Sequence, residues 1–80
     1  MKVEIITPDV TLFAGEHVQL VQLPGIDGSF EILNHHAALI SVLGKGKIKI
    51  LNTGEKEALF FDIQGGVIEV LDNKVLILAE

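Results

Sequence analysis

His35 and His36 follow Asp27 and Ser29 by only a few residues, and these four side chains are the most reactive grouping in the chain. Serine, histidine and aspartate could form a hydrolytic triad, but a triad needs a nucleophile held on a sharp turn in a concave site. Ser29 lies beside a glycine in a turn without that pattern. Adjacent side chains of an extended segment point to opposite sides, so the two histidines chelate a metal poorly, and His17 is remote in sequence. We therefore expect no catalytic residue and no metal site, but a polar turn in which one imidazole bonds to neighbouring backbone.

Gly25 and Gly28 are spaced as in part of a phosphate-binding loop. Such a loop is followed at once by a helix N-terminus, which supplies a dipole and free N–H groups. Here the glycines are followed by Phe30-Glu31-Ile32-Leu33, which is typical of a strand. The two glycines are therefore expected to supply positive φ angles in a tight turn, and no cofactor is predicted.

Lys74 follows Asp72-Asn73 in a segment that reads as a hairpin turn. Biotinyl and lipoyl carrier domains are small, acidic, all-β proteins that present a modified lysine at a hairpin tip. Their lysine lies near the middle of the chain in a local sequence such as M-K-M or D-K-A, whereas Lys74 lies six residues from the last residue, Glu80. A carrier domain is retained as the alternative function, and an exposed turn lysine is the simpler interpretation.

The composition excludes several classes of function. Net charge is −5, from eleven acidic residues and six lysines with no arginine, so specific nucleic-acid binding is not expected. No cysteine is present to form a disulfide or a thiolate zinc site. The longest apolar run, Val75–Ala79, is far shorter than a membrane span, and the first residues alternate like a strand instead of forming a signal peptide. We expect a protein that stays on the cytosolic side. The apolar fraction of 49% is more than so small a domain can hide, which indicates a partner interface.

Turn signals recur every few residues along the chain, and between them lie short runs of Val, Ile, Leu and Phe. This spacing predicts an all-β fold, an antiparallel β-sandwich of two sheets with about nine to ten short strands, and leaves no room for the crossovers that a parallel sheet requires. Residues 1–80 are expected to form one domain. The predicted strands are Val3–Thr7, Thr11–Phe13, Val18–Leu23, Phe30–Leu33, Ala38–Val42, Lys47–Leu51, Ala58–Ile63, Val67–Leu71 and Val75–Ala79.

Two kinds of strand are visible in these runs. Lys47-Ile48-Lys49-Ile50 alternates, with lysines expected toward water and isoleucines toward the core. Val75–Ala79, Leu20-Val21 and Leu39-Ile40 do not alternate, and strands that are apolar on both faces normally belong to sheets covered on both sides. A two-sheet sandwich covers one face of each sheet, so a partner should cover part of the other. Some exposure of single apolar residues, which is common in small domains, is the alternative.

The segment Pro24–Leu43 has the order P-G-x-x-G-x-F-x-I-L, two residues and then H-A-x-L-I-S-x-L. This order closely resembles the N-terminal domain of the epsilon subunit of F-type ATP synthases, whose mitochondrial counterpart is called delta. The opening Val3–Pro8 and the ending Gln64–Ala79 resemble the same domain, so the similarity covers essentially the whole chain. The chain departs from the family at Asn34-His35, where members often have Pro-Gly, at Ala38, where they often have a proline, and at Ser29, a position often occupied by a carboxylate.

The resemblance implies a non-catalytic, peripheral subunit of the proton-translocating ATP synthase at the cytoplasmic face of a bacterial membrane. It would join the gamma subunit to the ring of c subunits in the central stalk and couple proton flow to ATP synthesis. Family members often continue into a C-terminal helical hairpin that inhibits ATP hydrolysis; this sequence ends at Glu80, so coupling without that inhibition is expected. The turns around Asp27 and His36 are expected to form one tip on the c ring, and the gamma face is expected to be apolar. The implied c-ring contacts are Ile26, Asp27, Ser29, Asn34, His35 and His36, and the implied gamma contacts are Thr7, Leu39, Ser41 and Leu43.

Overall fold

A computed structural model describes all of residues 1–80. They form nine β-strands, joined by turns and loops, and no helix. All nine predicted strands are present, and their ends differ from the predicted ones by at most two residues. No segment forms a helix that is long and apolar enough to cross a membrane. The strands are β1 (Lys2–Ile6), β2 (Thr11–Gly15), β3 (Val18–Gly25), β4 (Gly28–Leu33), β5 (Leu39–Leu43), β6 (Gly46–Asn52), β7 (Leu59–Ile63), β8 (Gly66–Leu71) and β9 (Lys74–Ala79).

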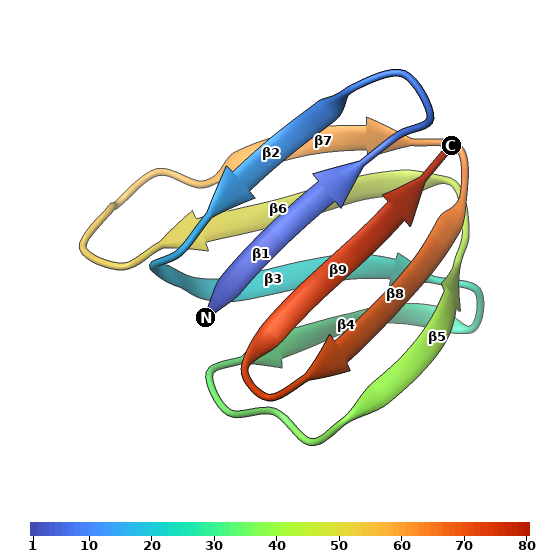
Figure 1. The fold of residues 1–80 in the computed structure, drawn as a ribbon. Coiled ribbons are helices and arrows are strands. Elements are labelled where there is room, and N and C mark those ends of the chain that lie inside the picture. The colour runs from blue at the N-terminus through green and yellow to red at the C-terminus, as the bar shows by residue number, and fades with distance from the viewer.

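The strands form two packed layers, which confirms the predicted sandwich (Figure 1). The first layer has the order β2-β1-β9-β8-β5, and the second consists of β4, β3, β6 and β7. The layers join where β5 meets β3 through the single pair Leu43 and Gly25, so hydrogen bonding is continuous around that side. On the other side no ladder joins β2 to β7, and the rings of Phe13 and Phe61 meet instead, with centroids 5.7 Å apart. The result is a nearly closed, barrel-like sandwich.

One strand pair differs from the predicted antiparallel pattern. β1 pairs with β9 in parallel, in a register that runs from Lys2 opposite Lys74 to Ile6 opposite Leu78. The prediction excluded parallel pairs because neighbouring strands lack a local crossover. Here the connection is the rest of the domain, since β1 and β9 are the first and last strands of the chain. The two ends of the sequence are thereby held in the same layer, with β1 inserted between β2 and β9.

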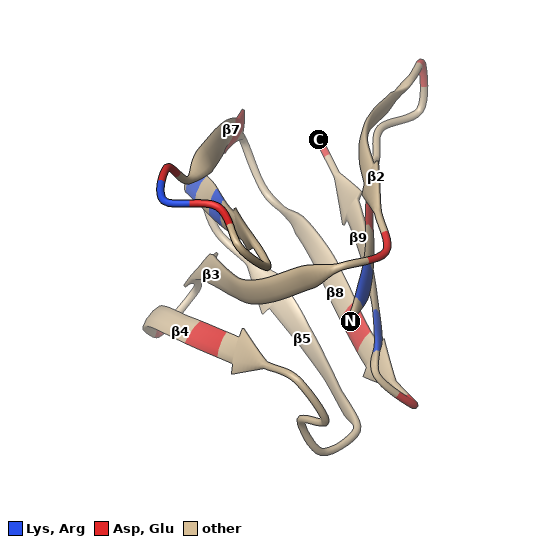
Figure 2. Ribbon diagram, turned by 90° about the vertical axis from the view of Figure 1, so that its left-hand side faces the viewer, with Lys and Arg blue, Asp and Glu red and all other residues tan.

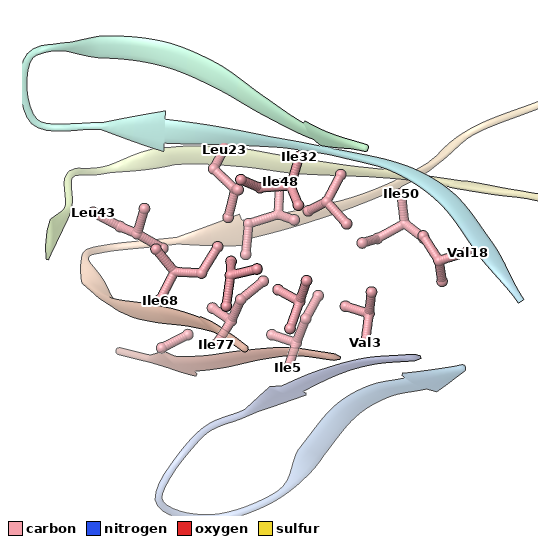
Figure 3. Close-up of a cluster of buried hydrophobic side chains, with 14 of the residues drawn as sticks. Val3, Ile5, Val18, Leu23, Ile32, Leu43, Ile48, Ile50, Ile68 and Ile77 are labelled. Carbon is pink, nitrogen blue, oxygen red and sulfur yellow. The ribbon is translucent and has the colours of Figure 1, made fainter. Parts of the chain in front are cut away.

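The core lies between the layers and contains sixteen buried residues, all of them apolar. Figure 3 shows side chains from both layers pointing toward each other, with Ile5, Ile68 and Ile77 on one side and Ile48 and Ile50 on the other. The predicted alternation of Lys47–Ile50 is confirmed, because Ile48 and Ile50 are completely buried. Each such side chain contributes about 1.5–3 kcal/mol by leaving water. No polar side-chain atom is buried without a hydrogen-bond partner.

Candidate functional site

The outer face of the first layer carries a row of apolar side chains that crosses four strands. Ile6 of β1 lies opposite Leu78 of β9, Leu78 opposite Val67 of β8, and Val67 opposite Val42 of β5. Directly opposed residues place their side chains on the same face of a sheet, so these four form one stripe, here named the outer apolar row. Val42, Val67 and Leu78 are exposed, although all three belong to strands whose inner faces line the core.

A shallow groove of about 670 Å³ lies along the outer apolar row. Thr7 and Pro8 border it at the end of β1, and the backbone of Gly65 and Gly66 borders it at the start of β8. Figure 2 draws β5, which forms the outer strand of this layer, without any charged residue. The face therefore offers a hollow, mostly apolar surface of the kind that a protein partner covers.

The predicted gamma contacts on β5 lie on its inner side. Leu43 borders the groove but is only 3% exposed, and its side chain lies in the core (Figure 3). Leu39 and Ser41 share its face of β5 and are half-buried, opposite the buried Val70 and Ile68. The residues that β5 presents outward are Ile40, which is 73% exposed, and Val42. Thr7 is half-buried at the edge of the groove, where its hydroxyl oxygen bonds within the β1–β2 turn.

The sequence offered no means of choosing between the two faces of β5. Four of its five residues, all except Ser41, are apolar, so alternation does not distinguish the inner set from the outer set. The sequence therefore did not indicate that Ile40 and Val42 are the exposed residues of β5. Only the pairing of β5 with β8 determines which residues face the core.

The first polar turn, Ile26-Asp27-Gly28-Ser29, forms the tip of the β3–β4 hairpin. Gly25 pairs with Gly28 at its base. Gly28 has the predicted positive φ, at 129°, but the same prediction for Gly25 is wrong, because its φ is not positive. Gly25 could not be replaced easily, because a Cβ there would lie 2.6 Å from the Gly28 carbonyl oxygen and 2.8 Å from the Phe30 ring. All four turn residues are exposed. The tip is therefore an exposed tight turn that a partner can reach.

The second polar turn, Asn34-His35-His36, lies at the other end of β4, beside the β8–β9 hairpin. The β8–β9 hairpin holds the backbone of this turn, because the N–H of His35 donates a hydrogen bond to Asn73 Oδ1 at 2.8 Å. His35 has a positive φ of 62°. His36 Nδ1 lies 2.8 Å from the carbonyl oxygen of Ala37, which confirms the expected bond between one imidazole and neighbouring backbone. The side chain of Asn34 accepts a hydrogen bond of 2.7 Å from the Met1 nitrogen.

These positions correct the expectation that the two turns form one tip. The turns precede and follow β4, a strand of six residues, which spans about 20 Å. Figure 1 shows them at opposite ends of that strand. They are two separate surfaces on the edge of the sandwich formed by β4, which pairs with β3 alone. Ser29 has no side-chain hydrogen bond to a histidine, and no group of three potential metal-ligating His, Cys, Asp or Glu residues occurs.

Asn34 also has a structural role that can be measured. Replacing Asn34 by alanine is expected to destabilise the domain by about 1.5–3 kcal/mol, because the partly buried Met1 ammonium loses a charge-assisted partner and keeps only the Val18 carbonyl oxygen. Urea denaturation followed by circular dichroism measures the change. Asn52→Ala is the matched control, since the Asn52 side chain makes no hydrogen bond, and its effect should be much smaller. Equal losses in both variants would contradict the role given to Asn34.

Comparison with known proteins identifies the family. Residues 1–80 match the family model for the beta-sandwich domain of the ATP synthase delta/epsilon chain. The ATP synthase epsilon chain of Chlorobium limicola is 42% identical over 79 residues, which are 99% of this chain and 88% of that one. The epsilon chain of Campylobacter hominis is 43% identical over 77 residues, which cover 95% of this chain and 58% of the relative.

A solved structure gives the same result for the fold. A chain in the central stalk and c-ring structure of the Tetrahymena thermophila mitochondrial ATP synthase superimposes with a TM-score of 0.84 at 26% identity. The match covers 98% of this chain and 61% of that one. The resemblance inferred from the sequence is thus confirmed. The chain belongs to the delta/epsilon chain family of ATP synthases, and its residues 1–80 match that family's β-sandwich domain.

Proposed function

We propose that this chain is a rotor subunit that links the gamma subunit to the c ring and so couples proton flow to ATP synthesis. The observation that carries the proposal is the match of all eighty residues to the family's sandwich domain, together with two chemically different surfaces on one rigid body. Transmission of torque requires stiff contacts and no reactive group. In this role the protein is peripheral, at the cytoplasmic face of a bacterial membrane.

The gamma subunit is assigned to the outer face of the first layer. The contact would be centred on the outer apolar row and Ile40, with Thr7 at its edge and Leu39 and Ser41 contributing only their exposed parts. Apolar burial suits a joint that must persist through every rotation, because it is strong and insensitive to salt. This assignment keeps the region predicted from the sequence and replaces the buried Leu43 by its exposed neighbour Val42.

The c ring is assigned to the edge formed by β4 and its two turns. Asp27 and the two histidines are exposed there and can form charge-assisted hydrogen bonds with polar loops, while Ile26, Ser29 and Asn34 complete the surface. Exposed polar contacts are weaker than apolar burial and are screened by salt. The two joints of the subunit therefore differ in strength and in salt dependence.

Calorimetric titration of the purified chain with the gamma subunit of the same ATP synthase tests the proposal. We expect one-to-one binding with a negative heat-capacity change, which marks the burial of apolar surface. Raising the salt concentration should change this affinity little. A folded, monomeric chain that does not bind gamma would overturn the assignment.

A further inference from the structure

Glu69 is an unpaired carboxylate with apolar nearest neighbours on the outer face of the first layer. Glu4, the other carboxylate of the row that crosses β1, β9 and β8 on this face, lies beyond Leu76 and is paired with Lys2. Glu69 lies on the outward side of β8, directly opposite Ile40 of β5 on one side and Leu76 of β9 on the other. Along its own strand the next outward residues are Val67 and Leu71. All four nearest positions on the face are therefore apolar, and three of the four, Ile40, Val67 and Leu71, are exposed. Glu69 itself is exposed.

No cation of this chain neutralises Glu69. The molecule has two ion pairs, Lys2 with Glu4 at 3.9 Å and Lys47 with Asp62 at 2.9 Å, and neither includes it. Lys74 lies on the same face in the adjacent row, opposite Leu71, and lines a hollow together with Glu69, Lys2 and Glu4, but it makes no ion pair. Because the Glu69 carboxylate is exposed and unpaired, it is hydrated by water in the free protein.

A partner that covers this apolar face must remove that water. An ionised carboxylate taken out of water without a counter-charge is strongly destabilising, whereas one that meets a cation and hydrogen-bond donors is tolerated. We infer that the gamma subunit presents an arginine or lysine opposite Glu69, surrounded by apolar side chains that meet Ile40 and the outer apolar row. Arginine fits best, because its planar guanidinium binds a carboxylate through two parallel hydrogen bonds. This inference rests on the proposed function.

The pair has a role that apolar contacts cannot perform. Apolar burial is non-directional, so the outer apolar row tolerates sliding and rotation of a partner surface. The Glu69 charge, which is unpaired within this chain, is satisfied by a partner cation in one position only, which defines the register of the joint and rejects partners without the cation. Glu69 is thus the specificity-determining residue of this surface.

Whether Glu69→Leu weakens or strengthens the binding of gamma tests for the cation opposite Glu69. If gamma carries the cation, Glu69→Leu leaves that cation buried and unpaired, and affinity should fall about 30-fold or more although apolar area has been added. Glu69→Lys should weaken binding further, and Glu69→Gln should bind more weakly than wild type. Titration calorimetry with purified gamma measures all of these affinities. Unchanged or tighter binding by Glu69→Leu would show that gamma meets this face with apolar groups alone and would overturn the inference.

Controls separate this inference from the proposed function. Glu57→Leu and Glu57→Lys make the same changes at an exposed position in the loop between β6 and β7, and both should bind gamma like wild type. Thermal unfolding of each Glu69 variant checks that it is folded, which is expected because the position is exposed. Wild-type binding together with full binding by the Glu69 variants rejects the counter-charge and leaves the rotor assignment standing. Absence of wild-type binding rejects both.

Discussion

Val42→Asp should weaken binding of the gamma subunit by about 100-fold, because it places an ionised carboxylate at the β5 end of the outer apolar row, next to Ile40 on the same strand. The change removes a side chain that lies opposite Val67 and adds a charge that the covered face cannot hydrate. Stability of the free domain should change little, since Val42 is 54% exposed and contributes nothing to the core. Titration calorimetry with gamma measures the affinity, and thermal unfolding measures the stability.

Leu33→Asp is the matched control for this prediction. Leu33 is also 54% exposed, but it lies at the end of β4 in the second layer. If the first layer is the gamma face, Leu33→Asp should bind gamma like wild type. A loss of affinity for Leu33→Asp with normal binding for Val42→Asp would transfer the gamma contact to the opposite side of the sandwich.

The second large effect is expected at Gly66, where alanine should destabilise the fold by about 3 kcal/mol or more. Gly66 has a φ of 155°, and a Cβ there would collide with the carbonyl oxygen of Leu78 and lie 3.1 Å from the Ala79 Cα. Both obstacles are backbone of β9, which is paired to β8 and to β1 and so has little freedom to move. A loss of this size lowers the melting temperature by about 12–24 °C in a domain of this length.

Gly54→Ala separates collision from backbone preference. Gly54 has a φ of 82°, which also disfavours alanine, but nothing lies within 4 Å of the position of its Cβ. Its cost should therefore be about 1 kcal/mol. Urea denaturation of the two variants measures the difference. Equal destabilisation would mean that the approach of β8 to β9 contributes nothing to the requirement for glycine at position 66.

Val42 and Gly66 lie on opposite faces of the first layer, since Val42 is exposed and Gly66 lies opposite the buried Leu43 and Ala79. In β5, β8 and β9 the inward side chains build a core that an eighty-residue domain needs for its stability, and the outward ones form the exposed row. The gain from burying the outward set is available only when a partner arrives. Because the same backbone ladders position both sets, the contact surface is as rigid as the core. This rigidity is what a subunit that transmits torque requires.

Much of this protein is determined by its sequence alone. The short apolar runs between turn signals specify nine strands, and the alternation of Lys47–Ile50 specifies which side of β6 is buried. These features are local, since strand propensity, turn chemistry and period-two alternation depend on residues a few positions apart. The bond between His36 and the Ala37 carbonyl group is local for the same reason. The order of motifs over all eighty residues also identified the family correctly.

Tertiary structure decided the rest, because each remaining feature depends on pairing between distant residues. Leu39–Leu43 is apolar on both faces, so only its register with β8 placed Leu43 in the core and Val42 outside. The parallel pairing of the first and last strands has no local signal, since the whole chain is the connection. Glu69 looks like an ordinary surface acid in the sequence. It becomes an unpaired charge with apolar neighbours only because β5 and β9, which lie far from each other in the chain, place Ile40 and Leu76 on either side of it.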